Sequence, residues 1–356
     1  MTFETGELSV EHLEDMLPNM DTIDKLLKEF LPKKNVQAID LIEDVWRGNW
    51  VLEPTLLWEY VVDNVDSYIT EIKTIFVSLL VLFIIASVIT TFLGALKNES
   101  TAKMAKFFFV LCELIVLLYI FRDVLDIVNV TMNKMIGFLK ITIPAYMMCI
   151  ALTGNGLSAV IFYKLLVGFL CLVEGILVSA LLPLAEGYAL LGVLESLFEE
   201  KRFSGLMRLI KDGILWGLKG MVMFVGGSGI LQLIITPVID KTKVSVLQKT
   251  MGALPGIGDI AESVSDITLV SAIAVKNSFG VIVLLVLVLI IIAPALHILV
   301  LLGTVKFASA MGGICGEKRM VECSEYVVDA GFMLLRMLVT VTTMFFLTLA
   351  AMTNVT

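Results

Sequence analysis

Long hydrophobic runs with few charges recur from residue 74 to the end of the chain. Thr74–Leu96 holds 23 residues without a charge, and Val281–Ala293 contains no polar residue. About 20 apolar residues in a helix cross the roughly 30 Å hydrocarbon core of a bilayer. Six runs reach or approach that length: Thr74–Leu96, Met104–Phe121, Leu165–Leu191, Gly217–Val238, Ser278–Gly303 and Gly331–Met352. The pattern predicts an all-α polytopic membrane protein with about six transmembrane helices.

One further apolar segment, Ile141–Tyr163, is broken by Pro144 and by a Thr-Gly-Asn-Gly sequence at residues 153–156. Counting it as a span gives seven crossings, and excluding it gives six. Cytoplasmic loops are enriched in Lys and Arg. With six spans, three dense basic clusters share one side: Lys97, Lys103 and Lys106; Lys201, Arg202, Arg208 and Lys211; and Lys306, Lys318 and Arg319. We therefore expect three hairpins with cytoplasmic turns, and a re-entrant or interfacial Ile141–Tyr163.

The N-terminal region, residues 1–71, differs from the rest of the chain in charge. It holds 16 acidic and 5 basic residues, whereas the remainder holds 18 acidic and 21 basic ones. Apolar residues at helical spacing, from Ile23 to Leu31, predict an amphipathic helix there. We expect an acidic, extracytoplasmic helical region that docks partners, followed by a transmembrane domain over residues 72–356.

The amino-acid composition excludes several other classes of protein. Hydrophobic residues make up 58% of the chain and charged residues 17%, against roughly a quarter charged in soluble domains. The sequence has no basic stripe with interleaved aromatic residues, so nothing in it predicts nucleic-acid binding. Neither a Walker A sequence nor a Gly-rich dinucleotide motif is present, so an ATP-driven process needs a separate motor subunit. The five cysteines form no Cys-x-x-Cys pair and the two histidines lie far apart, so we expect no metal site and no cofactor.

Two acidic residues inside apolar runs are the main candidates for function. Glu113 and Glu174 cost several kcal/mol if ionised in lipid, so such groups face a bundle interior or a wet cavity. They line a conduit or ion path, or they are hydrogen-bonded structural carboxylates. Because they lie on different predicted hairpins, they could also meet and share a proton.

Small and turn-forming residues supply the remaining candidates. Gly226, Gly227 and Gly229 lie inside a predicted span, where small residues usually serve close helix packing. The outer segment with Pro255, Gly256 and Gly258 lines a translocation path or forms a plain external loop. Ser228 and His297 also fit an intramembrane serine protease dyad, although nothing else resembles an oxyanion hole.

Several segments resemble the stage III sporulation protein AE family of endospore-forming bacteria. The likeness is carried by Asp21–Pro32 (DTIDKLLKEFLP), Met251–Gly258, Ala272–Gly280 (AIAVKNSFG), and Gly316–Arg319 followed by Cys323. It implies a polytopic, non-enzymatic subunit of the channel complex, a secretion-like apparatus, that joins mother cell and forespore. The implied place is the mother-cell membrane around the forespore. Family members commonly begin with a signal peptide, which the polar and acidic residues 1–20 do not predict.

The resemblance also implies partners. These are the other stage III sporulation proteins, AA to AH, including a separate ATPase and ring-forming subunits, together with the forespore protein Q. Further copies of the chain itself are a further candidate. A stand-alone secondary transporter remains the alternative, because membrane carboxylates, Gly/Pro-broken segments and a weak internal repeat of about 115 residues fit that class. The repeat rests on two Glu-Lys-Arg sequences, at residues 200–202 and 317–319, and on two similar outer connections, Met135–Gly137 before Pro144 and Met251–Gly252 before Pro255.

Overall fold

The computed structural model describes residues 54–95, 99–152, 156–198, 202–251, 258–314 and 318–353, with scattered positions between 21 and 45. These residues form long helices and no strand: α4 (Pro54–Ala95), α5 (Glu99–Leu152), α6 (Gly156–Leu172), the π-helix η1 (Val173–Leu181), α7 (Leu182–Leu197), α8 (Ser204–Met251), α9 (Gly258–Ile314) and α10 (Lys318–Thr353). The predicted all-α fold is confirmed. The Ile23–Leu31 stripe and the Pro255–Gly256 turn lie largely or wholly outside the described residues.

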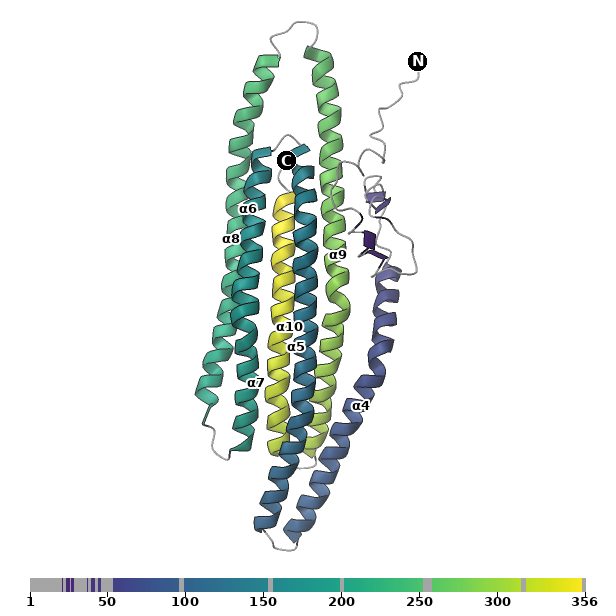
Figure 1. The fold of residues 1–356 in the computed structure, drawn as a ribbon, viewed down its shortest axis with the longest axis vertical. Coiled ribbons are helices and arrows are strands. Elements are labelled where there is room, and N and C mark those ends of the chain that lie inside the picture. The colour runs from purple at the N-terminus through teal and green to yellow at the C-terminus, as the bar shows by residue number, and fades with distance from the viewer. Residues whose placement is uncertain are drawn as a thin grey trace.

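The helices run up and down as three hairpins, α4 with α5, α6–η1–α7 with α8, and α9 with α10 (Figure 1). The α4–α5, α7–α8 and α9–α10 connections all lie at the same end of the bundle (Figure 1). The three basic clusters of the sequence lie in these connections or in the adjoining parts of α5, α8, α9 and α10. The hairpin order expected from charge is therefore the order that the chain adopts.

Among the residues that the structure describes, five helices are long and apolar enough to cross a membrane, within Tyr68–Ala95, Ser100–Ala151, Leu166–Leu197, Lys276–Ile314 and Lys318–Ala350. The sixth predicted run, Gly217–Val238, lies in α8, whose side chains from Ser228 onward are outside the described residues. Since α5 has 54 residues and α9 has 57, they are about 81 and 86 Å long at 1.5 Å per residue. Such helices project well beyond the hydrocarbon core.

Ile141–Tyr163 does not form the separate re-entrant or interfacial segment that we expected. Residues 141–152 continue α5 without a break, and Gly156 begins α6, which returns beside α5. Pro144 lies inside the helix, where it removes one backbone donor. Packing around it compensates, since Ala145, Tyr146, Cys149 and Ile150 are buried. The segment is thus the outer end of one hairpin and the start of the next.

The core of the bundle is built around α9 and α10. In the most apolar 18-residue stretch of each helix, 61% of the residues are buried in α9 and 56% in α10, but only 28% in α4. α10 packs against α5, α7, α8 and α9, whereas the main neighbours of α4 among the described helices are α5 and α9. One side of α4 packs inward through Ile75, Leu79, Phe83 and Ala86, and its other side exposes Val77, Val81, Ile84, Val88 and Phe92. An apolar face exposed over several turns suits contact with lipid.

The π-helix η1 joins α6 to α7 in one rod. Pro183 is the second residue after it and has no N–H to donate to the carbonyl of Ser179, four residues earlier. The N–H of Leu182 instead bonds the carbonyl of Leu177, five residues back, as a π-helix requires. The wider turn thus lets the rod pass Pro183 without ending. It also carries Glu174, one of the predicted candidates.

Candidate functional site

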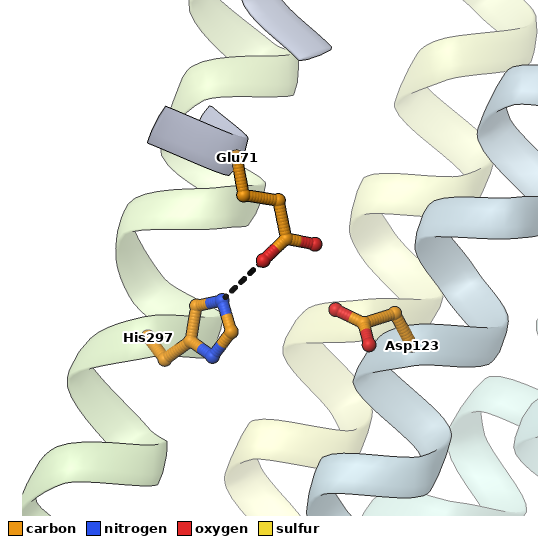
Figure 2. Close-up of side chains that lie close together, drawn as sticks. All are labelled: Glu71, Asp123 and His297. Carbon is orange, nitrogen blue, oxygen red and sulfur yellow. Dashed lines mark ion pairs between the residues drawn. The ribbon is translucent and has the colours of Figure 1, made fainter. Parts of the chain in front are cut away.

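Three ionisable side chains from three helices meet where α4, α5 and α9 pack together. Glu71 comes from α4, Asp123 from α5 and His297 from α9 (Figure 2). One ligand atom from each lies within 4.8 Å of the other two. The His297 Nε2 is 3.8 Å from an oxygen of Glu71. Among the described residues this is the group with the geometry to hold a metal ion.

His297 is fixed by its surroundings. Its side chain is 7% exposed, and its ring stacks on Tyr68 of α4 with 3.7 Å between ring centroids and 10° between planes. Tyr68 lies three residues before Glu71, so one turn of α4 supplies both the stacking ring and the carboxylate. The Glu71 side chain is 39% exposed, which leaves one route of access from outside the bundle.

The Glu71–Asp123–His297 cluster has more acidic groups than basic ones. Two carboxyl groups, Glu71 and Asp123, lie near the His297 imidazole, and Asp126, one turn along α5, also acts electrostatically on Asp123. No Lys or Arg in the described part of the chain forms an ion pair with Glu71 or Asp123. The His297 Nε2 and the Asp123 Oδ2 are buried without a hydrogen-bond partner among these residues. Buried polar atoms are normally paired, so these two atoms call for an explanation.

Glu113 faces the bundle interior, as the cost of a carboxylate in lipid predicts. It is fully buried on α5, and the Ser324 hydroxyl of α10 donates to its Oε1 at 2.7 Å. Its other oxygen, Oε2, has no partner among the described residues. On α7, Glu195 accepts a 2.7 Å hydrogen bond from the backbone N–H of Phe203, the residue before α8.

Glu174 has a different environment. It pairs with Lys140 of α5, whose Nζ lies 2.5 Å from Oε1, and both side chains are about half exposed. Lys140 and Glu113 are 27 residues apart on the same helix, about 40 Å at 1.5 Å per residue. Glu113 and Glu174 therefore do not meet, and the idea that they share a proton is wrong.

The structure describes the surroundings of only some of the glycine and proline candidates. A Cβ added at Gly226 or Gly227 of α8 would meet no atom within 4 Å. The surroundings of Gly229 and Gly258, and all of Pro255 and Gly256, are outside the described residues. His297 faces α4 and α5, whereas Ser228 belongs to α8, which runs on the other side of the bundle (Figure 1). The ring that a serine protease dyad would need thus points toward Glu71.

Sequence reasoning missed the Glu71–Asp123–His297 cluster. Its members are separated by 52 and 174 positions, and no local spacing links them. The available signal was a histidine in the most hydrophobic run of the chain, together with the acidic pair Asp123 and Asp126 directly after an apolar run. Which of these acidic residues lies beside the histidine depends on how the hairpins pack, and the sequence does not show that packing.

These features define a class, a polytopic helical membrane protein with polar groups held inside its bundle. Residues 36–356 match the stage III sporulation protein AE family, so the chain belongs to that family. It is 22% identical over 274 residues to stage III sporulation protein AE of Bacillus subtilis (strain 168), a match that covers 76% of this chain and 68% of that protein. No solved structure matches the chain. The resemblance drawn from the sequence is confirmed, and the chain is a membrane protein of sporulation stage III.

Proposed function

We propose that this chain is a non-enzymatic membrane subunit of the channel complex that links mother cell and forespore, placed in the mother-cell membrane around the forespore. The observation that carries the proposal is the family match over residues 36–356. The hairpin bundle, with five helices apolar enough to cross a membrane, supports a structural membrane role.

The packing of the bundle favours a scaffold over a pore within one chain. The centre is filled by apolar side chains of α10, among them Met333, Leu334, Met337, Leu338, Val341, Met344 and Phe345, each at most 1% exposed. Large apolar residues of α4 and α8 face outward instead, including Val81, Phe92, Trp216 and Phe224. In this proposal a conduit forms between this chain and other subunits.

The proposed partners are the other stage III sporulation proteins, AA to AH, and the forespore protein Q. A separate ATPase supplies energy, because the sequence carries neither nucleotide-binding motif. The acidic region 1–71 is the proposed docking surface outside the cytoplasm. Its part from Pro54 to Glu71 already belongs to α4, so movement at a docked partner would be passed directly to the first span.

The test combines recovery of partners with sporulation in the spore-forming host. A chain tagged at its C-terminus should recover the other stage III proteins after crosslinking in sporulating cells. A variant lacking residues 1–50 should still insert in the membrane but recover less of them. Equal recovery and normal sporulation with that variant would contradict the docking role.

A secondary transporter is the second candidate, because the half-exposed Lys140–Glu174 pair places charge on spanning helices. Purified chain in liposomes separates the two. Saturable, ion-coupled uptake without partner proteins would favour the transporter, and its absence with normal partner recovery would favour the subunit.

A further inference from the structure

We propose that Glu71, Asp123 and His297 bind one divalent transition-metal ion, such as Zn²⁺ or Co²⁺, at the junction of α4, α5 and α9. This inference concerns a site outside the residues that the sequence singled out as a conduit, and it does not depend on the channel role.

The geometry is close to that of a three-ligand site. An ion with bonds of about 2.0–2.2 Å to each ligand holds the ligand atoms roughly 3–3.5 Å apart. The three ligand atoms already lie within 4.8 Å of one another, and one Glu71–His297 distance is 3.8 Å. Glu71 and Asp123 are both partly exposed, so rotations of these two side chains can supply the remaining closure around the buried His297. Figure 2 shows all three side chains directed into the same space.

The unpaired atoms of the cluster indicate a cation. His297 is more than nine-tenths buried, yet its Nε2 has no hydrogen-bond partner among the described residues, and neither has the Oδ2 of Asp123. Two carboxylates that converge in a partly buried place repel each other unless a positive charge lies between them. One dication would coordinate the His297 nitrogen, which has no hydrogen bond in the described part of the chain, and would offset the two like charges.

The ligand types select the kind of ion. One imidazole nitrogen with two carboxylate oxygens suits borderline ions such as Zn²⁺ and Co²⁺, whereas the harder ions Mg²⁺, Ca²⁺ and Mn²⁺ prefer sites made of oxygen ligands. Three protein ligands leave a coordination position for water or for a group from a partner. The exposed side of Glu71 gives that position a route to the outside.

Binding would have a structural consequence for α4. This helix contacts α5 and α9 and has few other neighbours in the described bundle, and it carries the N-terminal region. A metal held by one residue from each of these three helices ties α4 to the core near the start of its apolar segment, Tyr68–Ala95.

The test uses the full-length chain in detergent, stripped with a chelator and titrated with Co²⁺ while its visible absorption is recorded. The wild-type chain should bind one equivalent, and Zn²⁺ should displace it. The variants are Glu71→Gln, Asp123→Asn and His297→Phe, of which the last keeps an aromatic ring against Tyr68. Each should weaken Co²⁺ binding at least tenfold, and added Zn²⁺ should raise the melting temperature of the wild-type chain only.

Matched controls are Glu174→Gln and Asp329→Asn, which remove acidic groups that are ion-paired with Lys140 and Lys211 elsewhere in the bundle. Both should bind Co²⁺ as the wild type does. Absence of one-site binding to the wild-type chain, or wild-type affinity for Co²⁺ in the cluster variants, would overturn the proposal and leave a polar cluster without a metal. If His297→Phe does not fold, the Co²⁺ affinities of the near-isosteric variants Glu71→Gln and Asp123→Asn still test the proposal.

Discussion

Glu113 shows how one acidic residue is kept inside an apolar bundle. The hydroxyl of Ser324 is the donor that its carboxyl group has in the described structure. We predict that Ser324→Ala lowers the stability of the detergent-solubilised protein by about 1–3 kcal/mol, because a buried acceptor loses its partner. The measurement is thermal unfolding followed by a buried-thiol dye.

Ser309 offers a matched control for that substitution. It is also a buried serine, on α9, but its hydroxyl has no hydrogen-bond partner among the described residues. Ser309→Ala should therefore be neutral or slightly stabilising. Equal losses in the two variants would mean that the Glu113–Ser324 bond contributes nothing specific.

The Lys140–Glu174 pair makes a second prediction at this scale. A charge on a spanning helix that loses its partner is costly in lipid, so Glu174→Leu should reduce the amount of inserted protein. Glu174→Gln, which keeps a hydrogen-bond acceptor for Lys140, should not. The double variant Lys140→Leu, Glu174→Leu should recover the wild-type level, measured by immunoblot of membranes. If the two single losses simply add in the double variant, the pair does not act as a unit.

At the scale of elements, helices approach closely where a glycine replaces a side chain. A Cβ on Gly192 of α7 would collide with the Cβ and ring of Tyr326 on α10. The Tyr326 Cβ cannot move without its backbone, so we predict that Gly192→Ala destabilises the protein by about 1–3 kcal/mol. Gly137→Ala on α5, where a Cβ meets nothing within 4 Å, should be neutral or stabilising by up to about 1 kcal/mol. Thermal unfolding of both variants checks the difference, and equal melting temperatures would contradict it.

The elements also show what hydropathy can and cannot predict. In the described part of the chain, the six apolar runs lie in helical rods, because burial in lipid demands both apolar side chains and satisfied backbone groups. The ends of the rods were missed, as in α5, which continues through Pro144 to Leu152. An apolar run predicts which part of a helix lies in the hydrocarbon core. It says little about how far the same helix continues into water or along other helices. The inward direction of Glu113 follows from its charge, but its partner Ser324, 211 positions later, depends on the packing.

At the scale of the whole molecule, the arrangement of the hairpins has one consequence for topology. The three basic connections lie at one end of the bundle, and α10 runs from that end toward the opposite one (Figure 1). Positive charge favours the cytoplasmic side, so that end should face the cytoplasm. Single cysteines test this in a background without native cysteines. Ser100→Cys and Ser204→Cys, conservative changes at exposed positions beside two of the turns, should resist a membrane-impermeant thiol reagent in intact cells.

Cysteines at Asp259, near the start of α9, and at Thr356 should react with the same reagent. All four should react once the membrane is permeabilised, which controls for thiols hidden by protein. The expectation follows from geometry, since two turns at one end of an antiparallel bundle must lie on one side of the membrane. Reaction at Ser204→Cys without reaction at Ser100→Cys would require an odd number of crossings between them. That result would contradict both the hairpin arrangement and the six-span topology, whereas reaction at both would keep the hairpins and reverse the orientation.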